Sequence, residues 1–184
     1  SSLNIPFINA SQTLTTTNPF TFQVASFVPD QHIVIFELEI TDNLGNVWNS
    51  TTNVLLNAPI LNHSTFIIDD SSNGNSNGRL DAGETLDLIV NVTNIGHADI
   101  VNITATLNSL STYVSVNSVS LNVASLNVNQ QQSATFNISI NSNTPVGVYA
   151  DFSFDLTDGV YSYNHTFNEI IGIIDEDYET GDFT

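Results

Sequence analysis

The sequence has no cysteine, no methionine and no lysine, and Arg79 is its only side chain that is always cationic. Without cysteine the chain has no disulfide framework and no thiol chemistry. One cation stands against 19 acids, giving a net charge of −18, so the basic patches that nucleic acids and anionic membranes require are missing. We therefore expect no nucleic-acid partner, and this charge suits a salty or calcium-rich exterior.

Long apolar runs are also missing, since no stretch is long enough to span a membrane or to act as a signal sequence. We therefore expect no membrane insertion. Because there is no methionine, Ser1 is not a translation start, and we expect the chain to be processed or to belong to something longer. The expected location is extracellular, at a cell surface.

Apolar and polar residues alternate in many short segments, and no segment shows a sustained helical period. Examples are Phe20-Thr-Phe-Gln-Val, Phe36-Glu-Leu-Glu-Ile and Phe152-Ser-Phe-Asp-Leu. A period of two places one face of a strand in a core and the other in solvent. Many such strands with turn signals between them predict an all-β, antiparallel, immunoglobulin-like β-sandwich. The expected strands cover residues 64–69, 85–94, 98–108, 112–116, 118–123, 134–141, 147–157 and 160–171.

The chain also repeats itself, with Phe36 aligned to Phe152 and Phe20 to Phe136, each 116 positions later. Residues 1–58 match only the second half of a complete unit at 63–174, so we expect them to adopt the strand arrangement of residues 117–174. In this alignment one hairpin is two residues longer in the first copy.

Half a sandwich leaves an apolar face and unpaired strand edges. Its expected partners are other copies of the chain or the rest of a larger parent protein. Residues 175–184 are acidic and predict a linker or tail.

Residues 73–84, NGNSNGRLDAGE, have the spacing of a calcium-binding loop. The expected ligands are Asn73, Asn75, Asn77, the backbone carbonyl of Arg79, Asp81 and Glu84, with Gly78 at the sharp turn. Position 1 of such a loop is normally Asp, so Asp69 or Asp70 is a candidate for a further ligand. The flanking segments predict strands, not helices. The alternative is an Asn/Gly turn that binds nothing, because these residues form turns unaided.

A family resemblance rests on two runs, Asn75-Ser-Asn-Gly-Arg-Leu-Asp-Ala-Gly-Glu-Thr and Val92-Thr-Asn-Ile-Gly-His-Ala-Asp. The chain resembles immunoglobulin-like modules of large secreted bacterial surface proteins. It is most similar to those that follow the catalytic domain of gingipain-like or subtilisin-like proteases exported by the type IX secretion system. The resemblance implies a Ca²⁺ site at the Asn/Asp-Gly loop, which Asn75, Asn77, Asp81 and Glu84 match, while Asn73 departs toward lower charge.

Signatures of catalysis are sparse, since the four histidines lie in separate segments and no nucleophile motif is present. A carboxylate pair of the glycosidase type remains open among 19 acids. We expect Phe152, Phe154 and Trp48 in a core, not on a sugar-binding platform. The expected function is a non-catalytic, calcium-stabilised spacer or binding module. The alternatives are a structural subunit of an extracellular filament or tube, assembled by strand or half-domain complementation, and an accessory region of a secreted protease.

Overall fold

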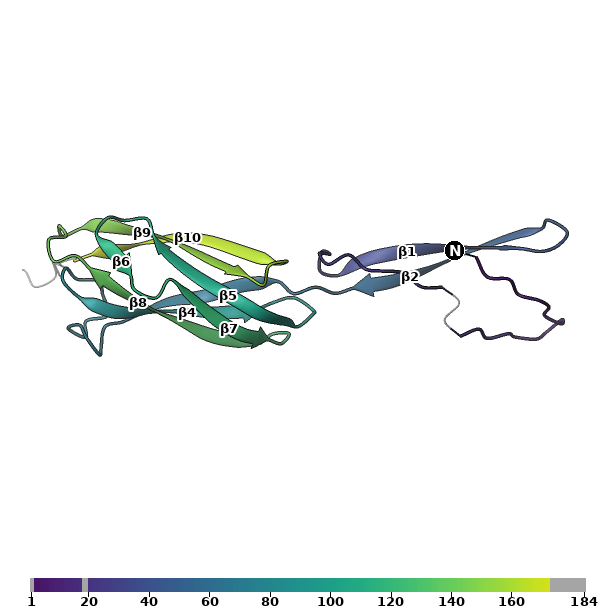
Figure 1. Ribbon diagram of the computed structural model, residues 1–184, viewed down its shortest axis with the longest axis horizontal. Coiled ribbons are helices and arrows are strands. Elements are labelled where there is room, and N and C mark those ends of the chain that lie inside the picture. Colours follow the sequence, from purple (N-terminus) through teal and green to yellow (C-terminus); the bar gives the residue numbers. More distant parts are fainter. Residues whose placement is uncertain (1, 18–19, 173–184) are drawn as a thin grey trace, which may run out of the picture.

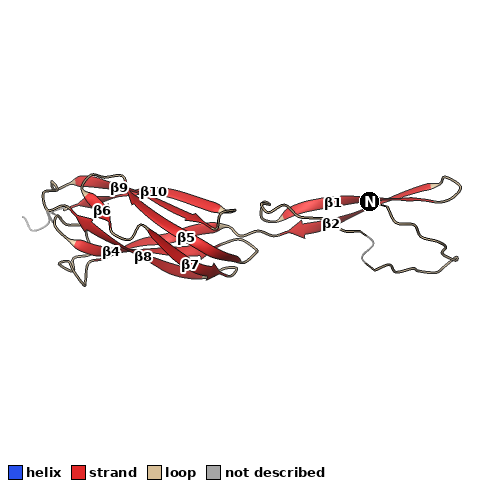
Figure 2. Ribbon diagram, in the orientation of Figure 1, coloured by secondary structure: helices blue, strands red, loops and turns tan. Residues whose placement is uncertain are grey.

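The computed structural model describes residues 2–17 and 20–172, which form ten antiparallel β-strands (Figures 1 and 2). Across these described ranges we find no helix able to cross a bilayer. The acidic segment 175–184 and the last two residues of the expected unit, 173–174, lie outside the described residues. The strands are β1 His32–Thr41, β2 Val47–Leu56, β3 Leu61–Asp69, β4 Thr85–Asn94, β5 Ile100–Ser109, β6 Val114–Val116, β7 Ser120–Leu126, β8 Gln131–Ile140, β9 Val148–Thr157 and β10 Ser162–Ile171.

Strands β3 to β10 form two four-stranded sheets, in the orders β3-β4-β8-β6 and β10-β9-β5-β7. The chain crosses between the sheets after each strand from β4 to β8, so β6 lies beside β8 while β7 lies beside β5. The prediction of an all-β architecture with antiparallel sheets is confirmed.

The core lies between these two sheets and follows the period-two pattern of the sequence. In β4 every second residue from Leu86 to Asn94 is buried, and in β9 the same holds for Phe152, Phe154 and Leu156. Because alternate side chains of a strand point to opposite faces, one face of each sheet is apolar and closed against the other.

Strands β1 and β2 form a separate hairpin, paired from His32↔Leu56 to Thr41↔Val47. Five residues, 42–46, connect the two strands, whereas four residues, 158–161, connect β9 to β10. The first hairpin is therefore one residue longer, not two as the alignment predicts. The side chain of Asp42 holds this turn by accepting hydrogen bonds from the backbone N–H groups of Leu44 and Asn46, both at 2.9 Å.

Residues 2–17 and 20–31 contain no strand, which differs from the prediction that residues 1–58 repeat the strands of 117–174. The reason is a lack of pairing partners. In the sandwich, β8 pairs with β4 and β7 pairs with β5. The first 58 residues contain no counterpart of β4 or β5, so the segments equivalent to β7 and β8 have no ladder to join.

The two parts lie end to end, with the hairpin extending beyond one end of the sandwich (Figure 1). The loop between β3 and β4 lies at the opposite end, where β10 also ends (Figure 1). Trp48, expected in a core, lies on the hairpin and is 54% exposed.

Candidate functional site

The β3–β4 loop brings together most of the residues that the sequence predicts as calcium ligands. The side-chain amides of Asn75 and Asn77 both donate to Oδ2 of Asp81, at 2.8 and 2.6 Å. Glu84 closes the loop, because its Oε1 accepts the backbone N–H of Asn75 at 2.9 Å and its Oε2 accepts that of Asp81 at 3.3 Å. Positions 3, 5, 9 and 12 of the predicted loop therefore face one another.

Asp70 also belongs to this cluster and is its most buried member, at 4% exposed. Its Oδ2 accepts the backbone N–H groups of Asn77 at 2.8 Å and Gly78 at 3.1 Å. Asn73 is exposed. Asp69 is held locally by Ser71, whose hydroxyl and backbone N–H donate to its Oδ1 and lower the pKa of its carboxyl group. Of the two extra candidates, Asp70 is the one that faces the loop.

Two glycines explain why the loop adopts this path. A Cβ on Gly74 would lie 2.7 Å from Cβ of Asp70 and 2.8 Å from its carbonyl oxygen, so only glycine lets the chain pass. Gly78 has φ +73, a left-handed conformation that costs glycine nothing. Two residues later Leu80 is buried in the core, and its carbonyl accepts the N–H of Gly172 at 2.8 Å. The loop is thus fixed at both β3 and the end of β10.

The chemistry of these donors fits a calcium ion. The described residues contain no group of three or more His, Cys, Asp or Glu placed to hold a metal. The candidate site instead combines amide oxygens with carboxylates, which calcium accepts equally. Ligands bonded at 2.3–2.6 Å lie about 3 Å apart around the ion. The amide nitrogens of Asn75 and Asn77 lie 2.6–2.8 Å from Asp81, while their oxygens accept the backbone N–H groups of Asn77 at 3.0 Å and Arg79 at 2.9 Å. To bind an ion, each amide must turn its oxygen toward Asp81 and give up its hydrogen bond to the backbone.

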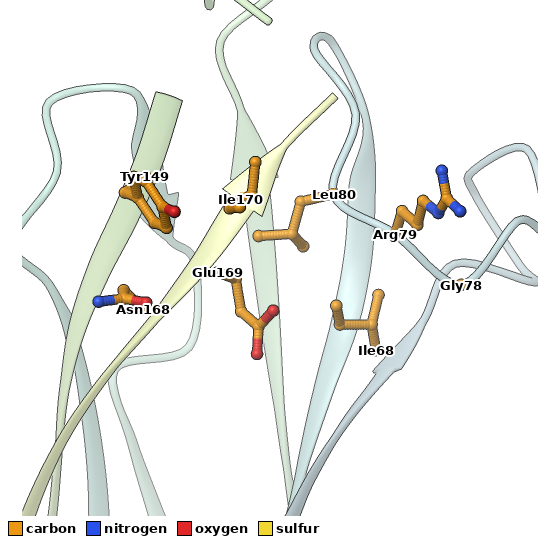
Figure 3. A pocket seen from close by; sticks show the side chains of 8 residues that line it. All are labelled: Ile68, Gly78, Arg79, Leu80, Tyr149, Asn168, Glu169 and Ile170. Atoms are coloured by element: carbon orange, nitrogen blue, oxygen red, sulfur yellow. The ribbon is translucent and has the colours of Figure 1, made fainter. Parts of the chain in front are cut away.

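A shallow hollow of ≈ 380 Å³ lies beside the loop (Figure 3). Its lining comes from the end of β3, from the loop, and from β9 and β10, and consists of Ile68, Gly78, Arg79, Leu80, Tyr149, Asn168, Glu169 and Ile170. Burial raises the pKa of the Glu169 carboxyl group. Apolar residues or glycine make up half of this lining, and residues with polar side chains make up the other half.

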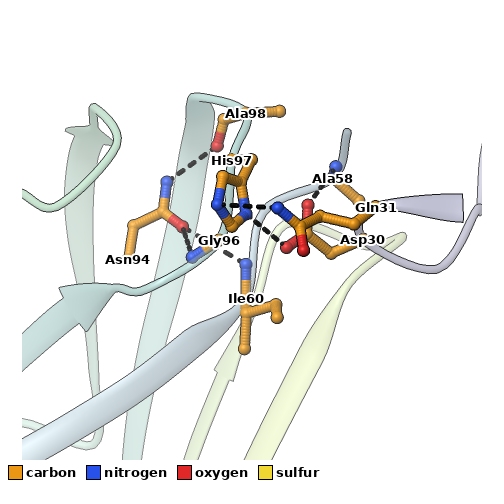
Figure 4. A network of polar contacts seen from close by, with 8 residues as sticks. All are labelled: Asp30, Gln31, Ala58, Ile60, Asn94, Gly96, His97 and Ala98. Atoms are coloured by element: carbon orange, nitrogen blue, oxygen red, sulfur yellow. Dashed lines mark hydrogen bonds and ion pairs between the residues drawn. The ribbon is translucent and has the colours of Figure 1, made fainter. Parts of the chain in front are cut away.

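A second organised region lies where the hairpin meets the sandwich (Figure 4). Asn94 is fully buried, and its side chain accepts the N–H groups of Ile60 at 3.2 Å and Gly96 at 3.1 Å while donating to Ala98 at 2.8 Å. The backbone N–H of His97 then donates to the carbonyl of Ala58 at 2.9 Å. The 94–98 turn is therefore hydrogen-bonded to the linker between β2 and β3.

The first part of the chain contacts the same turn from the other side. Oδ1 of Asp30 accepts the N–H of Ala58 at 2.9 Å, and its Oδ2 lies 2.7 Å from Nδ1 of His97. The Ala58 hydrogen bond and, after it, His97 lower the pKa of the Asp30 carboxyl group. Gln31 reaches Nε2 of His97 at 3.0 Å. A Cβ on Gly96 would lie 2.4 Å from the Ala58 carbonyl oxygen, so this close approach requires glycine.

Tyr161 adds a contact at the start of β10. Its hydroxyl lies 3.3 Å from the backbone nitrogen of Val28, and its ring lies 5.3 Å from that of Phe27. The sequence analysis did not identify this junction. The part of the sequence that could have indicated it is the Asn94-Ile-Gly96-His97 run, which belongs to the second run of the family resemblance. The partners of this run, Asp30 and Ala58, lie far away in the sequence.

Strands β3 and β10 are edge strands of the two sheets, and aromatic and histidine rings fill the seam between them. His63 and His165 lie 4.3 Å apart between ring centroids, and Phe66 stacks on Phe167 at 3.8 Å. Nδ1 of His63 lies 2.7 Å from the hydroxyl of Tyr163. Burial and then the charge of His165 lower the pKa of His63, while burial raises that of Tyr163. These side chains are used in packing the seam.

Comparison with known protein families finds no family that matches this chain. Comparison with curated proteins likewise finds none that is similar to it.

Proposed function

We propose that this chain is a non-catalytic, calcium-stabilised spacer module of a secreted surface protein, which holds successive immunoglobulin-like units end to end. The junction carries this proposal. Residues 58–60 are bonded on one side to Asn94 and His97 and on the other to Asp30. A spacer needs such a fixed connection, because an unbound linker lets its neighbours reorient freely.

The order of strands supports the immunoglobulin-like type of module. In that fold one sheet has the order A-B-E-D and the other contains C, F and G. The sheet β3-β4-β8-β6 follows the first order, and β5-β9-β10 follows the second, with β7 added beside β5. The charge of −18 suits a salty or calcium-rich exterior, which supports a secreted surface protein as the setting of this module.

The ion in this proposal has a structural role. Asn75, Asn77, Asp81, Glu84 and the backbone carbonyl of Arg79 would hold it, with Asn73 as a further oxygen at the exposed side. Asp70 would fix the path of the loop through the N–H groups of Asn77 and Gly78. Calcium supplies no chemistry to a reaction here. It neutralises the carboxylates and ties the end of β3 to the start of β4.

The junction is tested by measuring the distance between two spin labels, one on Leu44 at the hairpin turn and one on Val146 at the far end of the sandwich. Both positions are exposed, and the cysteine-free chain allows each to be labelled alone through an introduced cysteine. We expect a narrow distance distribution. Gly96→Ala should broaden it, because the new Cβ displaces the linker, whereas Ile95→Ala at the exposed neighbouring position should not. A broad distribution in the unsubstituted chain would refute the spacer.

Calcium binding is tested separately by thermal unfolding in chelator and in about 10 mM calcium. A dissociation constant on the order of 0.1–1 mM, expected for a loop of low charge, would stabilise the sandwich by about 1–3 kcal/mol. Glu84→Gln should remove most of this gain, and Asn73→Asp should increase it. Glu37→Gln, on the hairpin, is the matched control. An unchanged melting temperature would leave only an Asn/Gly turn.

A further inference from the structure

The hairpin β1-β2 is the counterpart of β9-β10 in the complete unit. Strand β1 covers residues 32–41 and β9 covers 148–157, so each residue of β1 has its equivalent 116 positions later. Both strands pair with the strand that follows them through a tight turn. Phe36 is thereby equivalent to Phe152, and Ile40 to Leu156.

Strand β9 has two neighbours, whereas β1 has one. Residues 152–157 of β9 pair with β5, from Ser109↔Phe152 to Thr104↔Thr157. The equivalent residues of β1 are 36–41, and no strand among the described residues lies on that edge. The first unit therefore lacks a strand at the position that β5 occupies in the second.

The second layer of the first unit is present but unpaired. The rings of Phe22 and Phe36 lie 5.0 Å apart, so Phe22 lies against β1. In the complete unit a ring of β8 also meets a ring of β9, with Phe136 and Phe154 at 6.1 Å, although these residues are the equivalents of Phe20 and Leu38. The first unit thus keeps one contact of this kind but lacks counterparts of β4 and β5.

Equivalent side chains show what is missing. Phe22 is 56% exposed and Ile40 is 47% exposed, whereas their counterparts Ile138 and Leu156 are fully buried. In the complete unit the covering strands are β4 and β5, which pair with β8 and β9. A segment that supplies these two strands would bury the exposed set.

We propose that residues 4–17 and 20–41 form an acceptor for a segment patterned like residues 61–116, whose β5-like strand pairs antiparallel with residues 36–41 of β1. A second copy of the chain does not supply this segment. Each copy has one first half, residues 61–116, which already pairs with the second half of its own complete unit. In the complete unit only three residues, 117–119, separate β6 from β7. We therefore place the segment in the same polypeptide, directly ahead of Ser1, where this connection can be repeated. The inference does not depend on calcium or on the spacer function.

The test joins a copy of residues 61–116 directly ahead of Ser1 of the full chain. The β5-like strand is probed by cysteine pairs in this cysteine-free background. Thr106 pairs with Asp155 in the complete unit, and Glu39 is the equivalent of Asp155. Thr106→Cys in the added copy should form a disulfide with Glu39→Cys. Asn108→Cys, displaced by two residues, should not, since its Cα lies beyond disulfide reach of position 39.

Hydrogen exchange gives the second readout. We expect the amides of residues 36–41 to exchange at least about tenfold more slowly in the joined chain, while β9 serves as the internal reference. Equal disulfide yields for the two cysteine pairs, or unchanged exchange in β1, would overturn the proposal, including the case in which the added copy stays unfolded. A dimer of the unextended chain with residues 36–41 protected would make a second copy the occupant and would also overturn it.

Discussion

Residues 1–58 and residues 61–172 carry the same alternating pattern, but only the second region buries it. Of the 27 large hydrophobic side chains that are exposed among the described residues, 17 lie in the first 58 positions. The core between the two sheets is built from residues after position 60. The difference teaches that an alternating pattern specifies which face of a strand is apolar, while burial requires partner strands that the pattern does not contain.

The hairpin and the segment before it also respond differently to the missing strands. β1 and β2 satisfy each other along ten residue pairs, so they remain paired. Residues 2–17 and 20–31 have equivalents that are strands in the sandwich, yet here they have no ladder. A local hairpin survives without its neighbours, whereas strands that depend on distant partners do not form.

The largest expected effect comes from truncating equivalent phenylalanines in the two regions. Phe152→Ala removes a fully buried ring and should destabilise the sandwich by about 3–5 kcal/mol. Phe36→Ala, at the equivalent position of β1, should change it by less than about 1 kcal/mol, because that ring is not closed within the core. Urea unfolding of both variants measures the difference. Equal losses would mean that the two regions share one core.

A smaller effect is expected from pH, and only in the sandwich. His63 has a lowered pKa in the folded chain, so the unfolded chain binds more protons below its ordinary value of 6.5. The stability that neutral His63 contributes is therefore present above pH 6.5 and is lost as the pH falls below it.

Thermal unfolding at pH 7.5 and pH 5 in about 10 mM calcium checks this expectation. His63→Phe should reduce the difference between the two pH values, while His32→Phe, on exposed β1, should leave it unchanged. If the melting temperature changes equally between the two pH values in all three proteins, His63 in the β3–β10 seam does not cause the pH dependence.

The smallest effect on stability is expected at the junction. Asp30→Asn removes the carboxylate that lies 2.7 Å from Nδ1 of His97 but leaves the core untouched, so the melting temperature of the sandwich should not change. The angle between hairpin and sandwich should become more variable, which small-angle X-ray scattering reports as an increased range of dimensions.

Acid should have the same effect on the unsubstituted junction. The pKa of Asp30 is lowered from 3.8, so its contribution is present above that pH and is lost as the pH falls through the folded value. Glu37→Gln is the control carboxylate, because Glu37 is exposed on β1. If Asp30→Asn scatters like the unsubstituted chain down to acidic pH, the backbone bonds of Ala58 and Gly96 alone fix the junction.

The sequence predicts the strands of the complete unit well, because each of them is amphipathic and has its partners nearby in the fold. The expected strand 85–94 coincides with β4, and 147–157 differs from β9 by one residue. The misses have a common cause. Residues 20–24 alternate like β8 but form no strand. Trp48 belongs to the hairpin and stays exposed, because no second sheet covers it. Local sequence carries no information on whether a distant partner is present.

The candidate calcium loop shows the same division. The spacing within residues 73–84 predicts that Asn75, Asn77, Asp81 and Glu84 lie together, and hydrogen bonds connect them in the structure, because spacing within one loop is a local property. The junction was missed, because Asp30 and His97 are 67 residues apart and the run that contains His97 does not indicate its distant partner. Asp70 was only a candidate from sequence, and its place in the loop depends on the close pass at Gly74.

The most direct test of the account is residue-resolved hydrogen exchange on monomeric chain 1–184, comparing residues 36–41 of β1 with residues 152–157 of β9. Both segments have the same pattern and both pair with a following strand. The account predicts strong protection throughout 152–157, which lies between β5 and β10, and weak protection in 36–41, whose second edge has no partner. Equal, strong protection of both segments in the monomer would contradict it, because the first unit would then be complete without any further strand.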